Sequence, residues 1–464
     1  MVNVGDFPYQ GTVAPWFIYF DDWSFVLDMS DDGRALCGET PSGQAGTAHG
    51  QGVRWDWDGS WPPKYVATIV PFPTTDTEIN PALGISPDGI NVVGDNARLN
   101  QGNDSAAYTV ISGTSQLLPF LPGFPSQAEG VAVANGNIVV GHINRYDSPA
   151  INRTALTVGA MWRPQAGGTF TPLPVRQSIG DPNPTYAAPD YGLPKCVKLY
   201  DVTADGRFTI GGGSSAIALQ AYTDPGLASE AVMYTLVGSS TGFRFKTTWL
   251  GFPPGIARNY SRAVRIASDS TNPKGVVVVG TSGGFRLDRN PNPSDRHSLD
   301  QRPTAWRVMG NNVTAQQLPL LKKSWSVPQD AKIGGAGAVS RTGDFIVGQC
   351  GTSPDFDTYD FDAVIWGREA EPRSIREILM DAGNTILINA GNTSLNDVKL
   401  DGATGVSADG SIVCGYGYKT DGTYFGWVAK LPQRWKLYDW TKIPRKLPNK
   451  RWHPLLPWRQ GFAP

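Results

Sequence analysis

The chain has 464 residues, a formal net charge of −1, 54 glycines and 37 prolines. So many chain-breaking residues exclude a coiled coil or a helical bundle, whereas 15 tryptophans, 16 tyrosines and 18 phenylalanines supply the apolar mass that a disordered chain lacks. No apolar run reaches the roughly 20 residues that span a bilayer, and the near-neutral charge gives the whole molecule no attraction to nucleic acid or a membrane surface.

The N-terminal segment predicts one strand and no export signal. Residues 1–6 contain neither a basic nor an apolar region, so no secretory signal is visible. The protein therefore acts where it is made, leaves by another route, or has been trimmed. Residues 15–20 (PWFIYF) form an apolar strand without a hairpin partner of its own.

A short pattern then recurs seven times. Each copy contains Ser, Thr or a relative, then Asp-Gly or a related pair, then an apolar run that ends in glycine. The terminal glycines are Gly38, Gly94, Gly141, Gly211, Gly280, Gly348 and Gly415. They lie 56, 47, 70, 69, 68 and 67 residues apart, so the copies fill the chain. Asp-Gly supplies the positive φ of a tight turn, and the β-branched residues around it favour strands, so each copy predicts a β-hairpin.

Two further segments complete each unit. A third strand carries Ala or Gly three residues before an aromatic residue, as in residues 159–162 (GAMW) and 363–366 (AVIW). A fourth segment rich in Leu and Pro follows, as in residues 117–119 (LLP) and 318–320 (LPL). Four short strands cannot bury both faces alone, so the units must stack.

These units predict an all-β protein, a β-propeller with seven blades of about four short antiparallel strands. Closure into a ring protects nearly every strand edge, and six or eight blades are the alternatives if the chain ends pair differently. The last copy ends at residues 428–432 without a fourth strand. We therefore expect residues 1–432 to form the propeller, with strand 15–20 closing the last blade, and residues 433–464 to form an extended tail.

Two local features complete this prediction. Residues 374–377 (SIRE) form a capping box before an apolar run and Gly383, which predicts one short helix. Cys37 and Cys414 each stand where other copies have Val or Ile, so we expect them to pack as small hydrophobic residues.

The last copy, VSADGSIVCGYG at residues 406–417 followed by a strand ending in Trp427, resembles the HAF family of extracellular repeats. The resemblance extends from about residue 25 to residue 432. It implies a β-propeller-like array of the kind found in exported or surface-associated bacterial proteins, usually without an assigned activity. The family has no agreed catalytic residues, so none is carried over. The chain departs from the family pattern in its missing export signal and in its C-terminal tail.

Catalytic motifs are weak. The four histidines (His49, His142, His297 and His453) are far apart in the sequence and none is paired at a ligand spacing, which disfavours a zinc site or a histidine general base. Residues 280–284 (GTSGG) match a nucleophile elbow, but the sequence that follows is not helical. The sequence therefore predicts a protein that is not an enzyme and needs no cofactor, calcium aside.

One acidic segment is a candidate calcium site. It contains four carboxylates within eight residues: Asp355, Asp357, Asp360 and Asp362. Carboxylate oxygens in an irregular loop suit Ca²⁺, although the segment lacks the glycine and terminal glutamate of an EF-hand. A solvated loop is the default interpretation, and calcium is the alternative.

The C-terminal segment 433–464 differs in composition from the rest of the chain. Its net charge is +7, which leaves −8 on residues 1–432, and it interleaves cations, large aromatic residues and prolines. The candidate binding residues are Arg434, Trp435, Lys436, Trp440, Arg445, Lys446, Arg451, Trp452, Trp458 and Arg459. Such a segment predicts an extended arm on a protein partner, or one that wraps over the acidic surface of its own chain. Nucleic acid and membrane are the disfavoured partners.

Two functions follow from these patterns. The first is a non-catalytic structural or attachment module in a larger surface assembly, such as a phage tail or capsid decoration, docked through the tail. The second is a glycan-binding or glycan-cleaving propeller that acts at its central mouth. The first hypothesis places the protein in a virion, at the cell surface or outside the cell. It is compatible with a homo-oligomer as well as with a virion assembly.

Overall fold

The computed structural model describes most of the chain between residues 14 and 432. The described ranges are 14–22, 24–41, 50–71, 81–97, 105–121, 127–145, 156–175, 197–213, 230–239, 242–255, 260–269, 272, 274–283, 301–322, 329–352, 361–366, 372–383, 385–389 and 394–432. The candidate tail residues, and Asp355, Asp357 and Asp360 of the acidic segment, lie outside these ranges.

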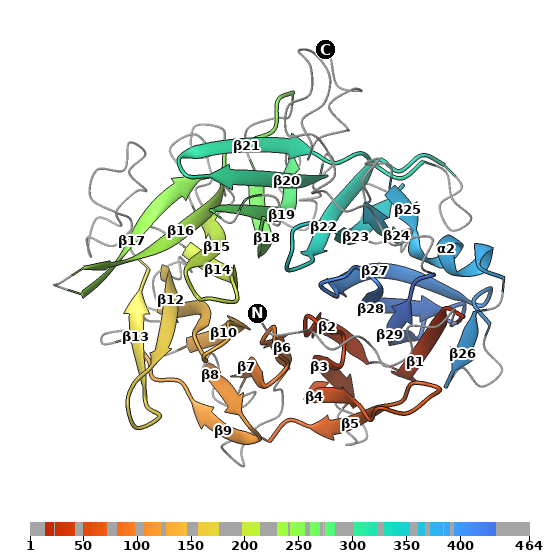
Figure 1. The fold of residues 1–464 in the computed structure, drawn as a ribbon, viewed down its shortest axis with the longest axis horizontal. Helices are drawn as coiled ribbons and strands as arrows, with labels where there is room; N and C mark the ends of the chain where they lie inside the picture. The colour runs from red at the N-terminus through yellow and green to blue at the C-terminus, as the bar shows by residue number, and fades with distance from the viewer. Residues whose placement is uncertain are drawn as a thin grey trace, which may run out of the picture.

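The described strands form a seven-bladed β-propeller, as predicted, with the first strand of each blade nearest the axis (Figure 1). Blade 1 contains β2 (Phe25–Met29), β3 (Ala35–Pro41), β4 (Gly50–Trp57) and β5 (Tyr65–Ile69); blade 2 contains β6 (Ala82–Ile85), β7 (Asn91–Ala97), β8 (Ser105–Ile111) and β9 (Thr114–Leu117). Blade 3 contains β10 (Gln127–Val133), β11 (Val139–Arg145), β12 (Leu156–Pro164) and β13 (Phe170–Pro174); blade 4 contains β14 (Val197–Val202), β15 (Phe208–Gly213), β16 (Glu230–Ser239) and β17 (Gly242–Trp249).

The remaining blades follow the same order. Blade 5 contains β18 (Tyr260–Ser268), β19 (Gly275–Gly283), β20 (Arg302–Met309) and β21 (Asn312–Gln317); blade 6 contains β22 (Ile333–Val339), β23 (Ile346–Gly351), β24 (Phe361–Trp366) and β25 (Pro372–Ser374). Blade 7 contains β27 (Val398–Val406), β28 (Ile412–Lys419) and β29 (Tyr424–Lys430), together with β1 (Trp16–Asp22) and β26 (Ile386–Ile388). A parallel bridge between Ser105 and Gln127 joins blades 2 and 3 into one sheet.

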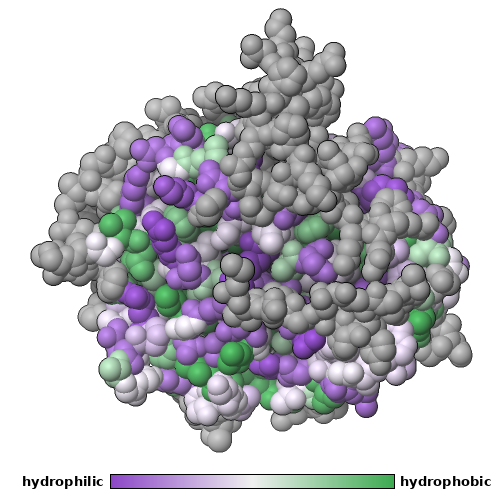
Figure 2. Space-filling view, in the orientation of Figure 1, coloured by the Kyte–Doolittle hydropathy of each residue, from purple (hydrophilic) through white to green (hydrophobic). Residues whose placement is uncertain are grey.

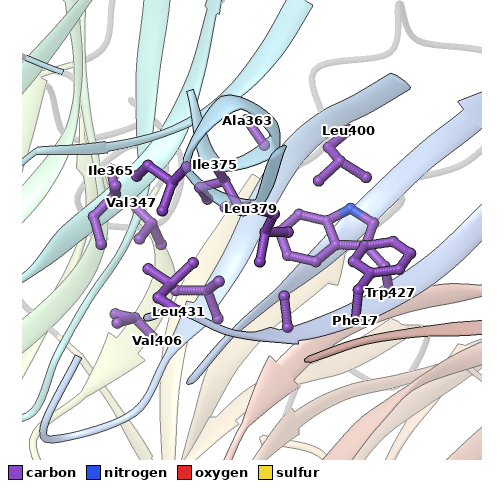
Figure 3. Packing of buried hydrophobic residues seen from close by; sticks show 14 of the residues in the cluster. Phe17, Val347, Ala363, Ile365, Ile375, Leu379, Leu400, Val406, Trp427 and Leu431 are labelled. Carbon is purple, nitrogen blue, oxygen red and sulfur yellow. The ribbon is translucent and has the colours of Figure 1, made fainter. Parts of the chain in front are cut away.

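Both ends of the described chain meet in blade 7. β1 runs antiparallel to β29, and β26 adds a parallel strand on its outer side. The apolar side chains of β1 are buried on both faces, and Phe17 stacks on Trp427 with ring centroids 6.2 Å apart (Figure 3). This burial explains why residues 15–20 are so apolar.

The terminal glycine of each copy is required because the backbone of the first strand approaches it. In every blade the register of the first strand shifts just after the residue that pairs with this glycine, which is a β-bulge. A Cβ on any of the seven glycines would overlap a carbonyl oxygen of the first strand or, at Gly94, that of Pro81 just before the first strand. The repeat therefore keeps glycine there for space and not for a positive φ.

The tryptophans of the third strands connect neighbouring blades. The indole nitrogens of Trp162, Trp306 and Trp366 donate to the carbonyl oxygens of Pro119, Gly251 and Pro319, at 2.8, 3.0 and 2.8 Å. Each acceptor belongs to the Leu-rich segment of the preceding blade. The two patterns seen separately in the sequence are thus the two halves of one seam contact.

The expected helix is α2 (Ile375–Asp381), which packs against the seam between blades 6 and 7 (Figure 3). Ser374 Oγ accepts from the Glu377 amide at 3.3 Å, and Gly383 ends the helix with a φ of +74°. The expected packing of the cysteines is also confirmed, because Cys37 and Cys414 are fully buried, as is Cys350.

Candidate functional site

The hairpin turns of the seven copies surround one mouth of the central axis. Backbone hydrogen bonds connect adjacent turns: Asp31 donates to Pro87, Asn135 donates to Ala204, and Ala408 donates to Asp31, at 2.7 to 3.0 Å. These bonds join the turns of blades 1 and 2, of blades 3 and 4, and of blades 7 and 1.

Seven equivalent positions point toward the axis behind this mouth. Each belongs to a first strand and pairs with the residue before the repeat glycine. They are occupied by Asp28, Gly84, Ala132, Asp201, Arg265, Ala338 and Gly405. All but Gly84 line a cavity of about 80 Å³. Four small residues therefore leave room for one cation and two carboxylates.

These three charged residues form an ion triad across the axis. Arg265 Nη2 lies 3.2 Å from Asp28 Oδ1, and Arg265 Nη1 lies 3.9 Å from Asp201 Oδ1. Arg265 also donates to the Leu27 carbonyl at 3.3 Å. The triad thus connects blade 5 to blades 1 and 4.

Each carboxylate of the triad also connects to the next blade. Asp28 Oδ2 accepts from the Ile85 amide at 3.1 Å, and Asp201 Oδ2 accepts from the Ile266 amide at 2.8 Å. Burial raises the pKa of Asp28 and raises that of Asp201 to about 6, although Arg265 opposes both shifts. Burial lowers the pKa of Arg265, but the two carboxylates outweigh it and the net shift is upward.

A second ion pair crosses the turn mouth. Arg341 Nη1, in the turn of blade 6, lies 2.6 Å from Asp31 Oδ2 in the turn of blade 1. Burial raises the pKa of Asp31 to about 6, against the charge of Arg341.

The raised pKa values predict how stability changes with pH. Asp31 and Asp201 bind protons more tightly in the folded protein than in the unfolded chain, so the folded state gains stability as pH falls through about 6 toward 4. We expect these two groups to raise the free energy of unfolding by about 2 to 3 kcal/mol when the pH is lowered from 7.5 to 5. Thermal melts of the wild type and of the double variant Asp31→Asn/Asp201→Asn, recorded across this pH range, would test this increase. The melting temperature of the double variant should change less with pH, and equal pH profiles would contradict the assignment.

A polar ring is formed by the residues that follow the repeat glycines, on the second strands. Six of these seven residues are polar or charged, and blade 4 has Gly212: the six are Glu39, Asp95, His142, Thr281, Gln349 and Tyr416. Two neighbouring members of the ring are in contact, because Tyr416 Oη donates to Gln349 Oε1 at 3.0 Å.

An acidic sector of this ring spans blades 1 to 3. Glu129, which pairs with His142 in the sheet, has its Oε2 3.0 Å from His142 Nε2. Burial raises the pKa of Asp95 to about 7, and the charge of Glu129 adds to the shift. Burial opposes ionisation of Glu129, but His142, Lys198 and Arg262 together outweigh it and lower the pKa of that carboxyl. The pKa values of these two carboxyls are therefore driven apart, as in a paired acid and base.

Only Asp362 of the candidate calcium ligands lies in the described part of the chain. It belongs to β24, pairs with Cys350 and is fully buried. The buried Arg376 of α2 lies close enough for the Asp362 charge to oppose the burial that lowers the Arg376 pKa. Asp362 is thus a core residue of blade 6 and not part of a solvated loop. Within the described ranges, no group of three His, Cys, Asp or Glu side chains is placed to hold a metal ion.

The structure brings together residues that the motif search did not select, above all the triad Asp28, Asp201 and Arg265. Aligning the copies on their glycines would have found Asp28 and Asp201, because a charged residue there replaces Gly or Ala ten positions before the glycine. It would not have found Arg265, which lies fifteen positions before Gly280 because the turn of blade 5 is longer. The same alignment would also have found Asp95 and His142.

Comparisons with known proteins add little about activity. No family model matches the sequence, and no curated protein matches it. Solved structures with similar folds include the β-propeller domain of Cps50 (Swd1) from Myceliophthora thermophila, at 8% identity over 92% of this chain and 100% of that one, with a TM-score of 0.43. An oligogalacturonate lyase in complex with manganese is 11% identical over 91% and 98%, with a TM-score of 0.44.

A third similar structure is the periplasmic gluconolactonase PpgL of Pseudomonas aeruginosa. It is 13% identical over 84% of this chain and 94% of its own, with a TM-score of 0.36. Similarity at this level carries no argument about activity. The described residues include no helix long and apolar enough to cross a membrane. Hydrophobic and hydrophilic residues are intermixed over the described part of the face in Figure 2.

Proposed function

We propose that this protein is a non-catalytic attachment module, a rigid propeller that is docked into a larger surface assembly. The observation that supports the proposal is the ion triad on the axis. The cavity around Arg265, Asp28 and Asp201 is about 80 Å³, which is small beside the 300 to 1,000 Å³ typical of ligand sites. A triad that connects three blades suits a body whose role is to hold its shape.

The docking element in this proposal is the segment 433–464. Its interleaved tryptophans supply apolar anchors for a protein partner, and its net charge of +7 suits an acidic partner surface. A virion, with the protein in its tail or decorating its capsid, is the assembly that we favour. Self-wrapping of the segment over its own propeller is the alternative.

Deletion of residues 433–464 tests this proposal. We expect the shortened chain to keep its melting temperature and its far-ultraviolet circular dichroism, but to leave the large-particle fraction when lysates of its native host are sedimented. A full-length variant with Trp435, Trp440, Trp452 and Trp458 replaced by Ser should behave in the same way, because it removes the anchors and keeps the charge. Normal sedimentation of both variants with particles would contradict the docking role.

A glycan-processing mouth is the second candidate, and the divergent pKa values of Asp95 and Glu129 favour it. One carboxyl that holds its proton near neutral pH beside one that is ionised is what acid–base cleavage requires. Cleavage of polysaccharides by the full-length protein, lost in Asp95→Asn, would replace the first proposal with this one.

A further inference from the structure

A groove of about 520 Å³ lies along the outer seam between blades 1 and 2. Its lining comes from the hairpin turns of both blades, from β4 and β5 of blade 1, and from β7 and the β8–β9 turn of blade 2. Its volume is in the range of small-molecule sites. Because the outermost strand β5 contributes to its lining, the groove lies at the outside of the ring, and it shares no lining residue with the axial cavity.

The groove exists because one blade departs from the repeat. On each third strand, one residue pairs with the repeat glycine. The residue that follows it in the sequence faces the next blade. In blades 2 to 7 this residue is fully or almost fully buried: Thr109, Met161, Met233, Ala305, Ile365 and Val428. The last five belong to the hydrophobic clusters of their seams.

Blade 1 has Arg54 at this position, with its side chain 28% exposed. An arginine in place of a packed apolar side chain opens the seam, and such departures from a structural pattern concentrate at functional sites. The rim also exposes Ile69 and Ile90 to about half of their area. The two exposed isoleucines therefore give the groove an apolar rim beside the charge of Arg54.

The hydrogen bonds of Arg54 define what the groove can bind. Arg54 Nε and Nη2 donate to the Asp56 carboxylate at 2.7 to 3.0 Å, and Nη1 donates to the Ile90 carbonyl at 3.1 Å. Of the five N–H groups of a guanidinium, two are left over, beside the remaining lone pairs of Asp56. Arg34 Nε and Asp32 Oδ2, 3.7 Å apart, form a second neutral pair at the rim.

Ion pairs without net charge next to aliphatic side chains suit a ligand that carries hydroxyl groups on an apolar ring. Vicinal hydroxyl groups each donate and accept, so they can accept from Arg54 while they donate to Asp56. The C–H face of a sugar ring can pack on Ile69 and Ile90. The charge of Arg54 is already compensated by Asp56, which leaves no excess cation for an anionic ligand. We propose that the seam groove between blades 1 and 2 binds a neutral sugar.

Saturation-transfer NMR on the full-length protein tests this proposal, with a panel of free neutral hexoses, deoxyhexoses and N-acetylhexosamines, and with glucuronate and galacturonate for comparison. We expect at least one neutral sugar to bind and the two uronates to bind less. Arg54→Met should weaken binding at least tenfold. This variant places at the seam the residue that blades 3 and 4 have there, so its melting temperature should be unchanged or higher.

Arg373→Met is the matched control, because it removes an exposed Arg–Asp pair, with Asp381, from blade 6. Its sugar binding should equal that of the wild type. The proposal is overturned if no neutral sugar binds, if Arg54→Met binds as well as the wild type, or if the uronates bind more tightly. Binding of an arrayed peptide library in the absence of any sugar binding would overturn it in favour of a peptide groove. None of these outcomes depends on whether the tail docks the protein.

Discussion

Replacement of Arg265 by methionine is expected to lower the free energy of unfolding by about 3 to 5 kcal/mol. Asp28 and Asp201 are each about 15% exposed and would remain buried without their shared cation. Removal of one partner from a buried ion pair is more destabilising than removal of the whole set. Urea denaturation at pH 7.5, followed by circular dichroism, would measure the loss.

A triple variant provides the control for this prediction. In Asp28→Asn/Arg265→Met/Asp201→Asn the amide oxygens can still accept from Ile85 and Ile266, while none of the three positions of the triad carries a charge. We expect it to recover most of the stability that Arg265→Met alone loses. If Arg265→Met is as stable as the wild type, the triad does not hold the blades together.

Replacement of Gly141 by alanine is expected to destabilise the protein by at least about 4 kcal/mol, or to prevent folding. The new Cβ would overlap the carbonyl oxygen of Glu129, and backbone cannot move aside as a flexible side chain can. Blade 3 would have to give up its bulge, or β10 would have to move away from β11. Expression in the soluble fraction and thermal melting would measure the effect.

Gly136, in the turn of the same blade, supplies a matched substitution. It has a φ of +75° and open space around its Cα, so Gly136→Ala adds backbone strain without a clash and should reduce stability by about 1 kcal/mol. Equal effects at the two positions would show that the repeat glycine is not kept for space.

The seven-bladed fold could be predicted because its signals are local and repeated. Asp-Gly pairs such as Asp88-Gly89 specify turns, and the capping box at Ser374 specifies a helix start. Repetition of the unit seven times, at spacings of 47 to 70 residues, then favours a ring. The reason for the repeat glycine could not be predicted, because the bulge that places a carbonyl oxygen against it lies on another strand.

The sites were harder to predict, since their residues are separated in sequence and converge only on the axis or in a seam. Asp28 and Arg265 lie 237 positions apart by residue number and meet because blades 1 and 5 share a channel. Arg54 looks like an ordinary surface residue until its counterparts, such as Met161, are seen to be buried. Asp362 misled the motif search because a run of carboxylates continues into the first residues of a buried strand.

The shared sheet of blade 7 has a consequence for synthesis on the ribosome. Among the described strands, β1 is the first to leave the exit tunnel and its partner β29 is the last. Blades 1 to 6 can therefore stack while β1 waits without its neighbours, exposing Trp16, Phe17 and Ile18 throughout elongation. Translation speed and chaperone supply should for this reason affect the yield of this protein more than that of a protein whose first strand pairs with the next one.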